Sequence, residues 1–243
     1  MNTYPTSLAS MRRSRAIFDG TKRVGDVLIS ATAIVILAPV MLAVALAIRV
    51  RMGRPIIFRQ ERVGRHGRSF IILKFRTLAM GDAHCCREPR ACVGMQTAAD
   101  SNVGRFPRFL RRTGLDELPQ LLGILRGDMS LIGPRPLLVR YLPRYTPIQA
   151  RRHEVRPGIT GWAQVNGRTD LSWEKRLALD VYYVDHRSFS LDAKIAWRTI
   201  AAIWGGKGFS QEGTGTGPEF LGREERVDIC PVTSEPVGYP AQR

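Results

Sequence analysis

A long uncharged stretch dominates the pattern of hydrophobic and polar positions along the chain. Residues 27–48 form a run of 22 almost entirely aliphatic positions without a charged side chain. A helix needs about 20 apolar residues to cross the hydrocarbon core of a bilayer, so this run is long enough to span a membrane. Pro39 lies near its middle, where the missing N–H and the bulk of the ring kink or break a helix. The pattern therefore predicts a membrane-embedded helix that changes direction at Pro39.

Both flanks of the apolar run are basic. The basic residues are Arg12, Arg13, Arg15, Lys22 and Arg23 before the run and Arg49, Arg51, Arg54 and Arg59 after it. Because positive charge marks the cytoplasmic side of a membrane segment, we expect residues 22–54 to form a re-entrant helix-break-helix that enters and leaves on the same face. Two other interpretations stay open on the sequence: a kinked single span, and a cleaved signal peptide or buried core helix.

Shorter apolar patterns predict a compact domain over residues 55–205. Two extended runs joined by a turn at 63–69, with 70–75 as the second strand, predict a small β-hairpin. Helical patterns recur in segments 106–112, 116–126, 137–154, 173–184 and 191–204. The sequence therefore predicts an α+β fold that is predominantly helical, with the membrane-embedded segment at its N-terminal side.

The remaining segments are basic, polar or ambiguous. Residues 1–21 form a basic lead-in, with a short amphipathic helix expected around 16–24. Residues 81–103 predict a loop, and residues 206–243 predict a disordered tail because they lack apolar periodicity. Trp197, Ile200 and Trp204 recur at helical spacing, a stripe that indicates either a core face or contact with a membrane interface.

The charge balance narrows the classes of partner. The chain has 37 Lys and Arg against 21 Asp and Glu, a net charge of +16, which points to nucleic acid, an anionic lipid surface or a phosphorylated substrate. Nucleic acid is disfavoured, since no nucleic-acid-binding module is recognisable and such a function would not explain the apolar run. Neither a Walker A motif nor a dinucleotide-binding glycine motif occurs. The four cysteines are too sparse for a disulfide framework.

The segment with the most chemical content is LDELPQ at residues 115–120. Pro119 is tolerated only in the first turn of a helix, so we expect a helix to begin near Asp116. Asp116 and Glu117 would then lie at the positive end of the helix dipole, where a carboxylate pKa is lowered and phosphate is attracted. An ordinary helix-capping role for the pair stays open. Four arginines near stiff turns suit bidentate phosphate recognition: Arg111, Arg112, Arg135 and Arg156.

Eight sequence blocks, in this order, resemble the monotopic phosphoglycosyl transferases, the bacterial sugar transferases that start polysaccharide and glycoconjugate assembly on undecaprenyl phosphate. The blocks are Lys22-Arg23 with Asp26 and Pro39, FRQERVG at 58–64, LKFRT at 73–77 with Met80, LDELPQ at 115–120, RGDMS at 126–130, GPRP at 133–136, RPGITG at 156–161 and LDVYYV at 179–184. Any single block is a weak signal, whereas eight in order are specific.

The resemblance implies an enzyme that transfers a sugar-1-phosphate from a UDP-sugar to undecaprenyl phosphate and releases UMP, the first step of exopolysaccharide or related glycan synthesis. By position, Asp116 would be the nucleophile that forms a covalent aspartyl-phosphosugar, Glu117 would assist, and both would hold Mg2+. The resemblance assigns the substrate phosphates to Lys74, Arg76, Arg112, Arg135 and Arg156, with Asp180 as a further helper.

The resemblance also implies a place in the cell: the bacterial inner membrane, with the catalytic domain facing the cytoplasm and held by anionic membrane lipids. Later glycosyltransferases would be further partners, and a homo-oligomer stays open. The chain departs from the family pattern at Ala38, where Ser often precedes the helix-breaking Pro39, and at Gly123, where Asn is common. The alternative function is a non-catalytic membrane-anchored scaffold that binds lipid phosphate in the same pathway.

Overall fold

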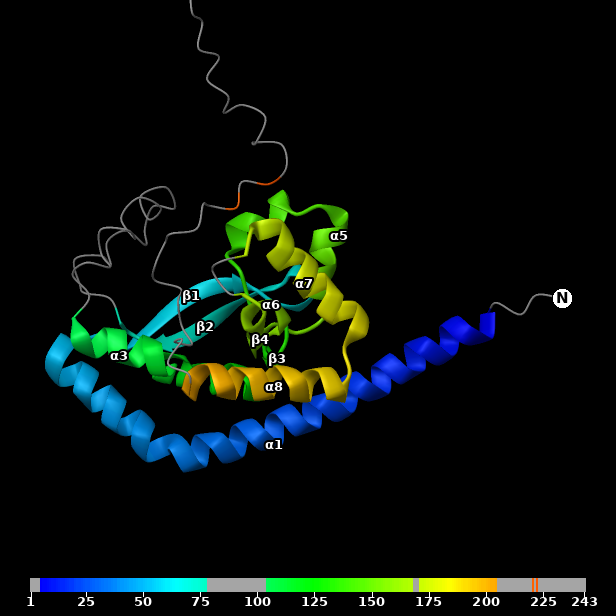
Figure 1. Cartoon of the computed structure of the whole chain (residues 1–243). Coiled ribbons are helices and arrows are strands. Elements are labelled where there is room, and N and C mark those ends of the chain that lie inside the picture. Colours follow the sequence, from blue (N-terminus) through cyan, green and yellow to red (C-terminus); the bar gives the residue numbers. More distant parts are fainter. Residues whose placement is uncertain (1–4, 78–103, 168–170, 205–219, 221, 223–243) are drawn as a thin grey trace, which may run out of the picture.

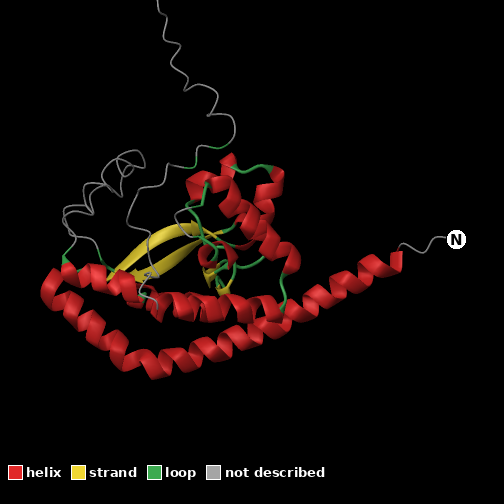
Figure 2. Cartoon of the chain, in the orientation of Figure 1, coloured by secondary structure: helices red, strands yellow, loops and turns green. Residues whose placement is uncertain are grey.

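The structure is a computed structural model that describes residues 5–77, 104–167, 171–204, 220 and 222. Helices make up most of the described chain, and strands are few and short (Figure 2). The predicted α+β, predominantly helical fold is therefore confirmed at this level. The loop expected at 81–103, with three of the four cysteines, lies outside the described residues.

The N-terminal segment forms one helix, α1 (Pro5–Met52), which runs along one side of the domain (Figure 1). Its assignment continues through Pro39 without interruption, and Figure 1 shows that the helix bends in its second half. The expected break is therefore a bend within a continuous helix, and the separate amphipathic helix expected at 16–24 is part of the same element. Re-entrant insertion stays a prediction.

The apolar part of α1 presents large side chains to the surroundings. Val35 is 75% exposed and Leu42 is 72% exposed, whereas Val44 and Ile48 are buried against the domain. The helix is long and apolar enough to cross a membrane by length and composition, and only 11% of its most apolar window is buried. Exposed apolar surface of this extent is typical of a face that contacts lipid or protein rather than water.

Two small sheets lie above α1. The hairpin predicted from the sequence is confirmed as β1 (Ile57–Val63) and β2 (Ser69–Phe75), which pair antiparallel across the short turn η1 (Arg65–Gly67). The second sheet was not predicted: β3 (Ser130–Ile132) pairs parallel with β4 (Gly158–Thr160).

Glycines bring the two proline-glycine turns together beside the second sheet. A Cβ atom at Gly158 would lie 2.1 Å from the backbone nitrogen of Gly133, and one at Gly133 would lie 2.4 Å from the carbonyl oxygen of Arg156. No side chain fits in such a space, so glycine is required at both positions. The close approach places the backbone of the 133–136 turn directly against that of the 156–161 turn.

The helical predictions succeed where the helix is long and fail where proline intervenes. The structure confirms α3 (Arg105–Thr113), α7 (Trp173–His186) and α8 (Phe189–Trp204). The helix expected over 116–126 is a 3-10 helix, η3 (Leu115–Gln120), followed by α4 (Leu121–Arg126), which is capped by Gly127. The stretch expected over 137–154 is η4 (Val139–Arg144), α5 (Pro147–Ala150) and η5 (Arg151–Glu154), because Pro143 and Pro147 interrupt it. The short α6 (Trp162–Val165) was not predicted.

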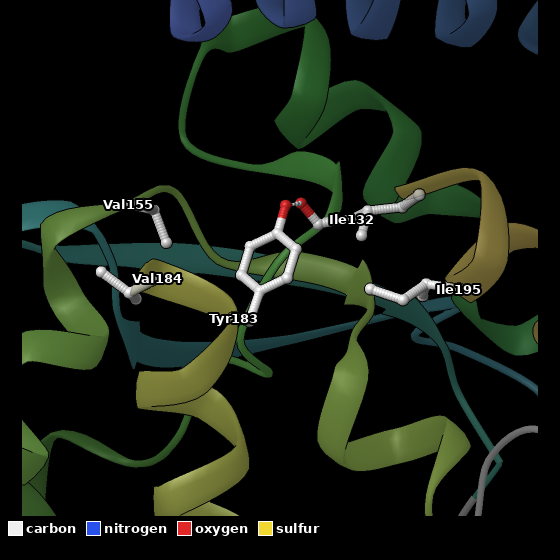
Figure 3. Close-up of a cluster of buried hydrophobic side chains, with 5 residues drawn as sticks. All are labelled: Ile132, Val155, Tyr183, Val184 and Ile195. Atoms are coloured by element: carbon white, nitrogen blue, oxygen red, sulfur yellow. Dashed lines mark hydrogen bonds between the residues drawn. The ribbon is translucent and has the colours of Figure 1, made fainter. Parts of the chain in front are cut away.

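Polar contacts join the first half of α1 to the domain. Ser130 Oγ donates a hydrogen bond to Asp26 (2.6 Å), and Lys22 Nζ donates one to Asp192 in α8 (2.7 Å). Tyr183, in the core cluster of Figure 3, donates its hydroxyl proton to the carbonyl of Ile132 or to Asp192, at 3.2 and 2.9 Å. The bonds of Asp26 and Lys22 attach the first half of α1 to strand β3 and helix α8.

Two expectations for the C-terminal part meet different outcomes. Trp197 and Trp204 are 70% and 84% exposed, so the stripe on α8 is not a core face of the described chain. Most of the tail at 206–243 lies outside the described residues, but Phe220 is described and is buried against Tyr141 and Trp173. At least this residue of the tail therefore packs on the domain.

His153 is a buried histidine that stays neutral in the folded chain. It lies in η5 with its ring 5.4 Å from that of Tyr145. Burial, followed by the charge of Arg152, lowers the pKa of His153 from 6.5 to about 4. The unfolded chain therefore binds a proton here between pH 6.5 and pH 4 that the folded chain does not bind.

We expect acid to destabilise the fold through His153. Stability from this residue is complete above pH 6.5 and falls as the pH drops toward 4, by up to about 3 kcal/mol. His153→Phe keeps a ring beside Tyr145 and removes the titration, so the fall in melting temperature from pH 7 to pH 5 should shrink in this variant. The matched control is His186→Phe, at an exposed histidine, whose acid sensitivity should equal that of the original chain. An unchanged fall in His153→Phe would contradict the assignment.

Candidate active site

The acidic pair lies in the 3-10 helix η3, between α3 and α4. Gly114 ends α3 with a left-handed backbone (φ 72°) and turns the chain into η3. Asp116 and Glu117 are only 4% and 2% exposed. The N–H of Glu117 donates a hydrogen bond to the carbonyl of Gly114 (3.1 Å), so this amide is not one of the open donors that an α-helix beginning at Asp116 would have offered.

Glu117 is held by two cations from distant parts of the chain. Lys74 Nζ, on β2, lies 3.1 Å from Glu117 Oε1, and Arg135 Nη2, in the turn after β3, lies 3.0 Å from the same oxygen. Both cations were predicted to bind substrate phosphates. The structure brings them together with the acidic pair, and it does so by joining three segments that are far apart in the sequence.

Burial makes Asp116 a weaker acid than an ordinary aspartate. Desolvation, followed by the negative charge of Glu117, raises the pKa of Asp116 from 3.8 to about 7, against the opposing charges of Lys74, Arg135 and Arg111. Burial therefore shifts this pKa in the direction opposite to the lowering expected from a helix dipole. Nearby positive charge, from a metal ion or the side chains around it, favours the ionised form that a nucleophile needs.

The donor set at the pair suits Mg2+. This ion is usually held by one or two carboxylates together with substrate phosphates and water, and two adjacent buried carboxylates with a raised pKa on one of them provide such a place. Among the described residues there is no cluster of three or more His, Cys, Asp or Glu side chains that would hold a metal without substrate. The pair would therefore hold the ion together with substrate phosphates.

On α3 the structure selects Arg111 rather than Arg112. Arg111 donates from Nε to Thr77 Oγ1 (3.0 Å), and its charge acts on Asp116. Arg112 is exposed and has no hydrogen bond or ion pair with any described residue. Arg111 is one helical turn after Pro107, which the structure buries, so both residues point to the inner face of α3.

Two further predicted phosphate ligands have other partners. The buried guanidinium of Arg76 donates to the backbone carbonyls of Met52, Gly53 and Arg54, where α1 ends. Arg156 donates from Nε to the carbonyl of Gly127 (2.9 Å) and lines a pocket beside α1. Neither side chain contacts Glu117, so Arg76 secures the end of α1 and Arg156 belongs to a different pocket.

Asp180 acts on the site through two arginines. It is buried and accepts hydrogen bonds from Arg152 Nε (3.1 Å) and Nη2 (2.7 Å). Arg152 Nη2 also donates to the backbone carbonyl of Arg135 (2.6 Å), the residue whose side chain holds Glu117. Burial raises the pKa of Asp180, and Arg152 opposes that rise. Asp180 and Arg152 therefore support the backbone position of Arg135. No sequence pattern marked Arg152, because this contact depends on tertiary packing.

The sequence comparisons agree on one family. The family model for bacterial sugar transferases matches residues 17–206. The chain is 46% identical over 175 residues to an uncharacterized sugar transferase, EpsL, of Bacillus subtilis, a match that covers 72% of this chain and 83% of that protein. It is 41% identical over 197 residues to the UDP-glucose:undecaprenyl-phosphate glucose-1-phosphate transferase of Caulobacter vibrioides, with coverage of 78% and 72%.

A longer relative is named for the same activity. The UDP-glucose:undecaprenyl-phosphate glucose-1-phosphate transferase of Escherichia coli K12 is 36% identical over 205 residues, which are 81% of this chain but 42% of that protein. The region matched by the family model contains all eight sequence blocks and the residues that surround Glu117. The resemblance seen in the sequence is thereby confirmed, and the chain belongs to the bacterial sugar transferase family.

Proposed function

We propose that the protein transfers a sugar-1-phosphate from a UDP-sugar to undecaprenyl phosphate, giving undecaprenyl-diphosphate-sugar and UMP. Relatives that cover most of this chain are named for this reaction with glucose-1-phosphate or N-acetylgalactosamine phosphate. One observation in the structure carries the proposal: a buried pair of carboxylates, Asp116 and Glu117, surrounded by cations from three other segments.

Asp116 is the nucleophile in this proposal. Its carboxylate oxygen attacks the β-phosphorus of the UDP-sugar, and the bond from that phosphorus to the bridging oxygen breaks, so that UMP leaves with the bonding electrons. The product is an aspartyl-phosphosugar. The surrounding cations, Lys74, Arg135 and Arg111, offset the charge that gathers on the phosphoryl oxygens.

The second step returns the enzyme to its starting state. A phosphate oxygen of undecaprenyl phosphate attacks the same phosphorus, the acyl phosphate bond breaks, and Asp116 regains its carboxylate. Glu117 assists by accepting a proton from the lipid phosphate or by ligating the metal. Asp116 and Glu117 would hold Mg2+, which supplies neutralisation of the diphosphate charge when it is bound.

The bent apolar helix supports a site at the membrane surface. We infer that α1 inserts in the bacterial inner membrane as a re-entrant element, with the catalytic domain on the cytoplasmic side. Both basic flanks of its apolar run favour one face of the membrane. A soluble nucleotide sugar and a lipid phosphate would then reach Asp116 in turn from opposite sides of one site.

The first test measures nucleotide release by the full chain in nanodiscs with Mg2+, undecaprenyl phosphate and a panel of UDP-sugars. Without the lipid phosphate, UMP release should stop at about one equivalent per enzyme. Multiple turnovers should require the lipid phosphate, and the productive donor identifies the sugar. Asp116→Asn should lower the rate by at least about a thousandfold, since no nucleophile remains. The matched control is Asp185→Asn, at a carboxylate paired with Arg151 outside the site, which should leave the rate unchanged.

Other outcomes of this test contradict the proposal. Release of UDP instead of UMP would mean direct glycosyl transfer. Full turnover in Asp116→Asn would remove Asp116 from the mechanism. Folded protein that releases neither nucleotide with any donor would support the membrane-anchored scaffold.

A second prediction concerns the cations around Glu117. Arg135→Met should weaken binding of the UDP-sugar by about tenfold to a hundredfold, because a charge-assisted hydrogen bond contributes about 1.5–3 kcal/mol. The measurement is calorimetric titration in the Asp116→Asn background, where the donor is not consumed. Lys175→Met, at an exposed lysine of α7, is the control and should bind normally. Equal affinities in all three proteins would exclude Arg135 from the phosphate site.

A further inference from the structure

A second charged pocket lies beside the first half of α1, away from the acidic pair. Its walls come from α1, the turn of the β-hairpin, β3, the segment before β4 and the end of α7. Neither Asp116 nor Glu117 lines it, and neither do Lys74 and Arg135. It is therefore distinct from the site where we place sugar-phosphate transfer.

Positive charge predominates in this pocket. Its cationic side chains are Lys22, Arg23, Arg65, Arg156 and Arg187. The carboxylates that line it are Asp19 and Asp26, and Asp192 pairs with Lys22 from outside the lining. Five cations against three carboxylates leave an excess of two positive charges. One anion with two negative charges, or two singly charged anionic groups, would neutralise this excess.

Some donors in the pocket have unused capacity. Arg156 uses only Nε, toward the carbonyl of Gly127, and among the described residues its two terminal nitrogens have no hydrogen-bond acceptor. Arg65 uses Nε toward the carbonyl of Glu154, and its Nη2 lies 3.9 Å from Asp19, beyond hydrogen-bond distance. Two guanidinium groups with available terminal N–H donors suit the oxygens of a phosphate group.

The position of the pocket points to a lipid. Lys22 and Asp26 come immediately before the apolar run that begins at residue 27, at the depth of the headgroups if that run lies in a bilayer. The apolar run starts one residue after Asp26, so the acyl chains of a lipid whose phosphate occupied the pocket would lie at the level of that run.

We propose that this pocket binds the phosphate of an anionic phospholipid headgroup and so fixes the depth and orientation of α1 against the domain. The bound lipid is a structural ligand and is not the acceptor of sugar-phosphate transfer. This inference rests on the proposed insertion of α1 in a membrane. Because lipid binding is measured without turnover, its failure is distinguishable from failure of the proposed transfer reaction.

The test uses native mass spectrometry of the full chain in neutral detergent with equal amounts of phosphatidylglycerol and phosphatidylcholine of the same acyl chains. The original chain should retain phosphatidylglycerol in preference to phosphatidylcholine. Arg156→Gln and Arg65→Gln should each lower that preference by about tenfold, the loss expected for one charge-assisted contact. Lys175→Gln removes a positive charge from an exposed site outside the pocket and should keep the full preference.

A parallel arm adds inorganic phosphate to distinguish the two sources of this chemistry. Phosphate should not displace phosphatidylglycerol if acyl chains contribute to binding. Displacement by phosphate that is lost in both arginine variants would assign the pocket to a soluble anion and overturn the lipid as its occupant. Equal retention of the two lipids, or a preference that survives in folded Arg65→Gln and Arg156→Gln, would overturn the site altogether. Melting curves of each variant establish that it is folded.

Discussion

The architecture of the active site depends on the burial of Glu117. A carboxylate that is only 2% exposed is costly unless opposite charges lie next to it, and here the charges come from Lys74 and Arg135. Meeting this requirement holds the hairpin, the 3-10 helix and the turn after β3 in one arrangement. The charges of the same two cations also act on Asp116. The pairing of Glu117 therefore fixes the arrangement of these segments and places positive charge beside both carboxylates.

A second layer of buried charge supports the first. Arg152 donates hydrogen bonds to Asp180 and to the backbone carbonyl of Arg135. These bonds fix the backbone of the residue whose guanidinium pairs with Glu117. Removal of one partner from such a buried pair typically costs about 3–5 kcal/mol. The glycine contact between residues 133 and 158 acts on the same turn through the backbone. The acidic pair is thus built on a support fixed by both side-chain and backbone contacts.

Helix α1 is attached to this support by polar residues in its first half, and many of its apolar residues remain exposed. Lys22 and Asp26 bond to Asp192 and Ser130, whereas Val35 and Leu42 remain exposed. The division follows from the sequence of α1, in which charged positions precede the apolar run. The charged part of α1 is therefore bonded to the domain through polar side chains, and the exposed apolar positions lie farther along the helix.

The sequence by itself determined the features that depend on local pattern. These are the long apolar helix, the hairpin, the helices α3, α7 and α8, and, through eight ordered blocks, the family. Tertiary structure alone decided the partners of single side chains: Arg76 caps the end of α1, Arg111 rather than Arg112 faces Asp116, and Arg152 connects Asp180 to the site. It also reversed the expected pKa shift of Asp116. Periodicity records which face of an element is apolar, but desolvation and long-range charge pairs depend on which elements meet, and no local pattern contains that information.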